Sequence, residues 1–170
     1  MQSQKELYNN YQRALGRIIG NLHSLELILR LFLHNVDSKR YGFPPPEVNL
    51  DKIRVGDIVP ENYFVNYDSL KDLVKKYNSL VTSQNAPDLC VDETVVNLRD
   101  AFAHGRVLSP APTPPFQLYK FGKPTKSRQV PVEYVTSLSE RELDGYIRRL
   151  FQQIKKVEEA CKRFCPSALG

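Results

Sequence analysis

An apolar stripe runs without interruption through the first part of the chain and constrains it to a long helix. Its members recur at steps of three and four, the spacing of one face of an α-helix. They are Leu7, Tyr11, Leu15, Ile18, Leu22, Leu25, Leu29 and Phe32. We therefore predict a helix from about Gln4 to Val36, which at 1.5 Å per residue is about 45 Å long. A mainly all-α fold follows.

Two glycines interrupt this helix one turn apart. Gly16 and Gly20 lower its intrinsic helix propensity, so we expect a reason for their presence. A close approach by another backbone would supply one. The approaching backbone could belong to a helix of the same bundle or to a second copy of the chain.

Three further apolar patterns predict three more helices. One spans about Asp68 to Val81, one ends at Gly105, and one opens at Ser139, where Glu142 completes the pattern of a capping box. We expect Gly105 to adopt the left-handed conformation that ends many helices. The apolar positions are Leu70, Leu73, Val74, Tyr77 and Leu80, then Val91, Val95, Leu98 and Phe102, and finally Leu143, Ile147, Leu150, Ile154, Val157, Cys161 and Phe164.

The segments between these helices read differently. Residues 37 to 66 include three successive prolines and isolated aromatics, which predicts a surface loop ordered by those aromatics. Residues 110 to 135 form a proline-rich connector followed by two runs of period-two alternation, 116 to 121 and 129 to 135, which predict a β-hairpin. Pro131 places its strand at a sheet edge. The expected fold is a four-helix bundle with a small β-hairpin before the last helix, in a single domain of residues 1 to 170.

Composition limits the class of protein. The chain has 170 residues with 41% apolar content, enough for one core, and no apolar run approaches the roughly 18 residues of a membrane helix. No amino-terminal signal pattern is present, so we expect a soluble cytoplasmic protein without membrane contact. The three cysteines and three histidines lack metal-ligand spacing. We therefore expect idle thiols, no metal and no cofactor.

Positive charge concentrates before the last helix. The net charge is +5, and residues 111 to 137 contain Lys120, Lys123, Lys126 and Arg128 against Glu133 alone. An RNA backbone would favour such a stretch. A solvated basic loop is the alternative.

The third helix carries the candidate chemistry. RNA can be cut without a metal when its 2′-hydroxyl attacks the adjacent phosphate, which requires proton transfer and positive charge. His104 can move protons and Arg99 can stabilise the pentavalent phosphorus, while Asp100 could orient either group and Arg106 could hold a neighbouring phosphate. On a regular helix Arg99 and His104 point about 140° apart. They converge only if His104 swings round at the helix end or a second chain completes the site.

The spacing of this pair is a weak signal by itself. Arg17 and His23 satisfy a similar pattern inside the first helix. The structural alternative is that Arg99 pairs with Glu26 or Asp100 while His104 only caps its helix.

Other polar groups interrupt the first helix. His23, Glu26 and Arg30 lie at successive turns, where they could line the same cleft as a second layer or form a solvated edge. His34, at the end of that helix, is expected to be an exposed capping residue.

Two stretches resemble the HEPN superfamily of small helical bundles. They are the phrase LRDAFAHGRV, which contains Arg99, Asp100 and His104, and the helix NLHSLELILRLFLHN. Asp100 stands where asparagine is common in that family. The resemblance implies a metal-independent endoribonuclease of a toxin or antiviral-defence system, and a homodimer in which two copies of the motif line one cleft. A cognate antitoxin or another protein partner is then possible.

Two other functions stay open. One is a catalytically silent HEPN-like dimer that binds nucleic acid or nucleotide. The other is a structural dimer, or a partner-binding one, without a functional cleft.

Overall fold

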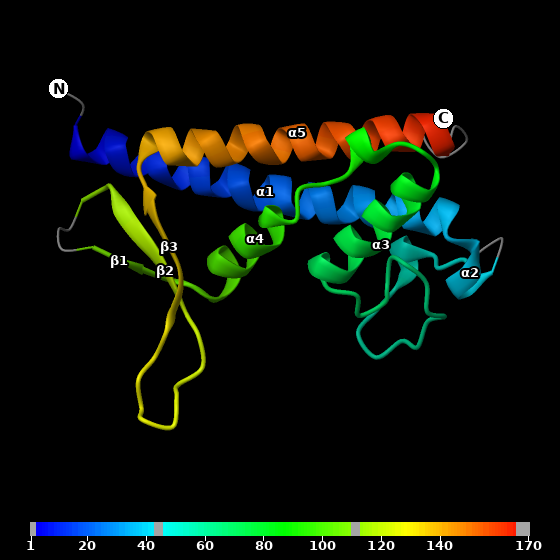
Figure 1. Cartoon of the computed structure of the whole chain (residues 1–170), viewed down its shortest axis with the longest axis horizontal. Coiled ribbons are helices and arrows are strands. Elements are labelled where there is room, and N and C mark those ends of the chain that lie inside the picture. The colour runs from blue at the N-terminus through cyan, green and yellow to red at the C-terminus, as the bar shows by residue number, and fades with distance from the viewer. Residues whose placement is uncertain (1–2, 43–45, 110–112, 166–170) are drawn as a thin grey trace. The chain divides into compact units, whose positions relative to one another are not determined.

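A computed structural model describes residues 3–42, 46–109 and 113–165 of the chain (Figure 1). The protein is mainly helical and contains one three-stranded antiparallel sheet. It divides into two compact units: residues 1–23 with 92–152, and residues 24–91 with 153–170. The helices α1 (Gln4–Val36) and α5 (Glu140–Phe164) contribute residues to both units.

The long first helix has the bounds that its apolar stripe predicts. Its inward positions from Ile18 to Phe32 are buried. Gly16 and Gly20 are exposed, and a Cβ atom built on either would meet no described atom within 4 Å. The predicted close approach by another helix of the same chain is therefore wrong. At these two positions the backbone of α1 is exposed without a covering side chain.

The first unit combines the start of α1, the helix α4 (Thr94–His104), the sheet and the start of α5. The strands are β1 (Arg106–Leu108), β2 (Phe116–Phe121) and β3 (Val132–Leu138), in the order β1-β2-β3. The predicted hairpin is confirmed as β2 and β3, whereas β1 is an addition. β3 is an edge strand, as Pro131 indicates. In Figure 1 the turn between β2 and β3 projects beyond the paired strands.

Gly105 joins α4 to β1 in an unexpected conformation. Its φ of −76° and ψ of 172° are extended, so the predicted left-handed cap is wrong. Its N–H donates to the carbonyl of Ala101 at 2.7 Å. A Cβ at this position would lie 2.2 Å from that carbonyl oxygen, 2.7 Å from Leu118 Cδ1 and 2.9 Å from the carbonyl oxygen of Tyr119. Glycine is needed here because the helix end packs directly on β2.

The last helix begins where its capping residue predicts. Ser139 Oγ accepts a hydrogen bond from the Glu142 N–H at 3.3 Å, which satisfies one of the otherwise unpaired amides of the first turn. The apolar stripe of α5 is buried from Leu143 to Cys161, and Phe164 is half-buried. Periodicity therefore identified the inward face of this helix correctly.

The second unit contains the helix α3 (Leu70–Ser83), which begins and ends two residues later than predicted. Ser69 and Asp72 form a capping box at its start.

The predicted loop of residues 37 to 66 also contains a short helix, α2 (Ser38–Tyr41), and a 3-10 turn (Leu50–Lys52). A second 3-10 turn, Pro87–Leu89, lies after α3. Tyr63 and Asn62 in this loop are buried. Ordering by aromatics is confirmed, since the Tyr63 ring packs edge-on against Tyr41 at 5.2 Å.

His34 is half-buried, so its predicted exposure is wrong. Its ring lies 4.7 Å from the ring of Phe64. Its Nδ1 atom is buried and has no hydrogen-bond partner within the described residues. Burial lowers the pKa of His34 below the ordinary 6.5. Phe64 of the loop packs on this histidine and shields part of its ring from water.

The cysteines are free. Cys161 and Cys165 are buried, and Cys90 is half-buried. A hydrogen bond with Cys165, together with burial, raises the pKa of the Cys161 thiol. A thiol held in its protonated form is a poor nucleophile.

Candidate functional site

Arg99 and Asp100 form an ion pair on the outer side of α4. The helix buries Val95, Leu98 and Ala101, which leaves these polar neighbours at its margin. Arg99 Nη1 donates to Asp100 Oδ1 at 2.8 Å, and each side chain is about one-third exposed. Of the two carboxylates considered from the sequence as partners of Arg99, Asp100 is the one that binds it. The guanidinium is thereby held in a defined place.

Asp100 also faces a positive charge on the sheet. Lys120 of β2 places its Nζ atom 4.0 Å from Asp100 Oδ2 and 3.2 Å from Glu133 Oε2. The result is an alternating row of four charges, Arg99, Asp100, Lys120 and Glu133. Pairs this exposed add little stability, because water screens them. Their effect is to orient Arg99 and Lys120 and to neutralise them locally.

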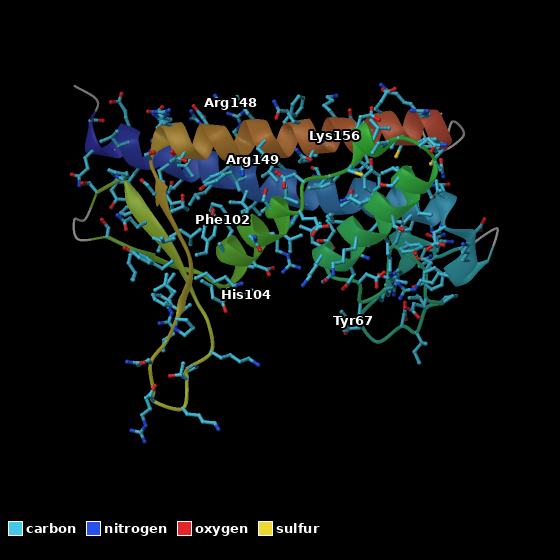
Figure 2. The ribbon with its side chains drawn as sticks, viewed as in Figure 1. Tyr67, Phe102, His104, Arg148, Arg149 and Lys156 are labelled. Atoms are coloured by element: carbon cyan, nitrogen blue, oxygen red, sulfur yellow. The ribbon has the colours of Figure 1, made fainter. Side chains whose placement is uncertain are left out.

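His104 lies at the carboxyl end of α4, where Figure 2 shows its side chain at the helix terminus. It is exposed, and within the described part of the chain its imidazole makes no hydrogen bond or ion pair. No hydrogen bond joins His104 to Arg99 in the described part of the chain. One copy of the chain therefore presents the two groups separately.

The predicted phosphate-binding residues divide between the sheet and its turn. Arg106 begins β1, and its guanidinium lies over the ring of Phe121 with 5.6 Å between Cζ and the ring centroid. Lys123, Lys126 and Arg128 are exposed in the turn between β2 and β3. These three make no ion pair with any described residue. They remain available to an anionic partner, unlike Lys120.

Arg30 has a structural position in the second unit. All five of its N–H donors are used. Nε and Nη2 donate to Glu26 Oε1, at 3.1 and 2.8 Å. Nη1 donates to the Tyr63 carbonyl at 2.7 Å and to Asn66 Oδ1 at 2.8 Å, and the second N–H of Nη2 donates to the Asp68 carbonyl at 2.9 Å. Its side chain is only 12% exposed. Arg30 and Glu26 thus fix the loop before α3, which accounts for the polar interruption of α1.

His23 belongs to the first unit and is exposed on α1. Among the described residues it makes no hydrogen bond or ion pair. Arg17, which forms the similar Arg–His pattern with His23, also makes no hydrogen bond or ion pair with a described residue. Nothing joins this pair to a neighbouring group, so it serves as a natural control for the pair on α4.

A cluster of hydroxyl groups beside α4 was not predicted from the sequence. Tyr146 of α5 lies 2.5 Å from Thr136 Oγ1 and 3.3 Å from the Tyr134 hydroxyl, both on β3. Burial and the contact with Tyr146 raise the pKa of Tyr134. The Phe102 ring of α4 packs edge-on against Tyr146 at 6.5 Å. A signal existed, because Tyr146 directly precedes a stripe position, but its strand partners are not visible in a one-dimensional pattern.

A cleft of about 340 Å³ also lies in the first unit, between α1, the start of α5 and the segment before β2. The residues that line it include Leu7, Tyr11 and Leu143 together with Arg13 and Arg17. None of the residues predicted to bind or cleave RNA lines it. The cleft and the Arg99/His104 pair therefore share no residue.

Metal and membrane features are not found in the described residues. No three histidine, cysteine, aspartate or glutamate side chains among them gather as a metal site would require. None of the described helices is both long and apolar enough to cross a membrane.

Comparison of the chain with protein-family models, with curated proteins and with solved structures finds no match.

Proposed function

We propose that this protein is an endoribonuclease that cuts RNA without a metal ion, at a site that two copies of the chain complete. The observation that carries the proposal is the exposed imidazole of His104 at the end of the helix that also holds Arg99. An accessible histidine can exchange protons near neutral pH, and a guanidinium held by a carboxylate offers fixed donors to phosphate oxygens.

The second copy solves a geometric problem. Arg99 and His104 are five positions apart on α4, and on a regular helix their side chains point about 140° apart. In a symmetric pair of α4 helices, His104 of one copy would face Arg99 of the other. Two histidines would then be present, and one can act as base while the other acts as acid.

The chemical step is a transesterification. A neutral imidazole of His104 takes the proton of the ribose 2′-hydroxyl, and the 2′-oxygen forms a bond to the adjacent phosphorus. The bond from phosphorus to the 5′-oxygen breaks, and that oxygen receives a proton from the imidazolium of the other copy. Arg99 stabilises the negative charge of the pentavalent intermediate. The products are a 2′,3′-cyclic phosphate and a 5′-hydroxyl.

A cleavage assay with EDTA tests the proposal. Single-stranded RNA should be cut and should leave 2′,3′-cyclic phosphate ends, whereas DNA of the same sequence lacks the attacking hydroxyl and should stay intact. Chelator-sensitive activity or equal cutting of DNA would contradict the role of Arg99 and His104. A toxin or antiviral-defence role belongs to the same proposal, and growth arrest after induced expression is its test.

One observation favours a second candidate, an RNA-binding protein without cleavage. Asp100 already occupies the Arg99 guanidinium and lies beside Lys120, which lowers the positive charge offered to a phosphate. Binding of RNA without any cleavage, in wild-type protein, would select this candidate.

A further inference from the structure

The sheet of the first unit has two chemically different faces. Leu118 is buried and Lys120 reaches Asp100, so these β2 residues point toward the helices. Side chains alternate along a strand, which places Tyr119 and Phe121 on the opposite face. Arg106 of β1 is the direct strand partner of Tyr119 and shares that face.

Planar groups gather on this outer face. The rings of Tyr119 and Phe121 are nearly parallel, with 9° between their planes and 6.0 Å between their centroids. The Arg106 guanidinium lies over Phe121. We call these three residues the aromatic platform. Aromatic rings and guanidinium planes are the surfaces on which unpaired RNA bases stack.

The rings of Tyr119 and Phe121 are half-buried, and apolar residues beside them are more exposed. Val135, the β3 partner of Tyr119, is 54% exposed, and Leu108 of β1 is 49% exposed. An apolar sheet face of this kind is rarely left uncovered without a function. A face of this kind is suited to binding a partner.

The charge beside the platform indicates which partner. Phe121 leads directly into the turn that carries Lys123, Lys126 and Arg128, which are exposed and form no ion pair with a described residue. Backbone hydrogen bonds order this turn, from Thr125 N–H to the Gln129 carbonyl at 2.7 Å and from Arg128 N–H to the Thr125 carbonyl at 2.9 Å. Rings next to ordered positive charge match a strand that has exposed bases and a phosphate backbone.

We propose that the aromatic platform binds single-stranded RNA by stacking its bases on Tyr119 and Phe121, while the basic turn holds the phosphates. This inference rests on the proposed function for the identity of the nucleic acid and goes beyond it by assigning the base-binding surface. Because Gly105 packs on the Tyr119 carbonyl and leads straight into Arg106, the platform is rigidly attached to the end of α4 that carries His104.

A binding titration separates the platform from the chemistry. The ligand is a fluorescent 2′-O-methyl RNA of about twelve nucleotides, which lacks the attacking hydroxyl and stays intact whether or not the protein is a nuclease. Tyr119→Leu and Phe121→Leu remove the rings but keep apolar side chains on the strand. Val135→Ala is the matched control, because it trims an exposed apolar group on the same face. Thermal melts verify that all variants fold.

Each leucine variant should weaken binding about 5- to 100-fold, the worth of one stacked base, while Val135→Ala changes it less than about twofold. The slope of log affinity against log salt should stay the same in the leucine variants. In Lys123→Ala or Lys126→Ala the slope should become shallower by about 0.7 for each phosphate that the removed lysine had neutralised. A Phe121→Trp variant, in a chain without other tryptophans, should lose fluorescence on RNA binding.

Wild-type affinity in both leucine variants would overturn the proposal, as would failure of the wild-type protein to bind the RNA. A loss of self-association instead of RNA affinity would show that the face is an interface between copies. The nuclease proposal fails separately: if Arg99→Ala and His104→Ala leave cleavage intact while the leucine variants lose binding, the platform stands and the catalytic assignment does not.

Discussion

Asp100 binds the guanidinium of Arg99, the residue directly before it, at 2.8 Å and also lies 4.0 Å from the Lys120 ammonium group. A carboxylate so placed competes with a phosphate for two cations. Its negative charge would weaken the attraction of this end of α4 for a phosphate group.

Asp100→Asn should therefore tighten RNA binding by about three- to tenfold at low salt, because it removes a negative charge beside Arg99 and Lys120, and the gain should shrink as salt rises. Titration of 2′-O-methyl RNA into the variant measures this. Glu93→Gln removes the same charge at the other end of α4 and is the control. Weaker binding in Asp100→Asn would mean that its main role is to orient Arg99.

His104→Ala and Arg99→Ala should each reduce cleavage by about 10² to 10⁴ fold, the usual effect of losing a positioned proton donor or charge stabiliser. His23→Ala should retain activity, because His23 is exposed on α1 and is not part of the proposed site. Rates on labelled RNA, with thermal melts alongside, measure the difference. Equal losses in all three variants, or unfolding of the first two, would favour a purely structural pair.

The chain should form a homodimer through the surface around Arg99 and His104. Light scattering at tens of micromolar should give twice the 19.5 kDa of one chain, since a typical dimer dissociates near 1 μM. Ala103→Arg adds charge and bulk to an exposed position beside His104 and should produce monomers. Ser79→Arg, exposed on α3, is the control. A wild-type monomer at these concentrations would remove the basis of the shared site.

Gly105→Ala should destabilise the protein by at least about 2 kcal/mol, because its Cβ would overlap the Ala101 carbonyl and the end of Leu118. Gly20→Ala has open space around it in an exposed helix and should stabilise by about 0.5 to 1 kcal/mol. Urea unfolding of both variants tests the contrast. A harmless alanine at position 105 would mean that the helix end and β2 can separate easily.

His34 should make stability depend on pH. Burial lowers its folded-state pKa below 6.5, so the unfolded chain binds more protons as the pH falls below that value, and the folded state loses stability there. The free energy of unfolding should fall more between pH 7 and pH 5 in wild-type protein than in His34→Leu. His23→Leu, at an exposed site, should follow the wild type. Parallel curves for the wild type and His34→Leu would contradict the burial effect.

The long helices could be predicted because their signal is local and repeated. Eight stripe positions agree on the bounds of α1, and the regular stripe of α5 gives its inward face. The β2–β3 hairpin was visible for the same reason. The three-residue strand β1 is too short to show a period, and it forms only because β2 lies beside it.

Features that depend on distant partners were beyond the sequence pattern. Gly105 looked like a helix cap, but its need for glycine comes from contacts with Leu118 and Tyr119, thirteen and fourteen positions later. The sequence allowed Arg30 to be a cleft residue or part of a solvated edge, whereas its partners Tyr63 and Asp68 lie in a loop more than thirty positions away. At the candidate site, the sequence allowed the Arg99–Asp100 pair as one alternative, whereas the position of Lys120 beside Asp100 depends on the fold of the sheet.

Because α4 passes directly into β1, the junction between them fixes the register of this strand. Gly105 is the single residue between the helix and the strand. Since side chains alternate along a strand, adding or deleting one residue here would exchange the two faces of β1 and turn Arg106 toward the interior. Lengthening the turn between β2 and β3 would leave that register unchanged. A change of length is therefore compatible with the register of β1 at the hairpin tip, but not at this joint.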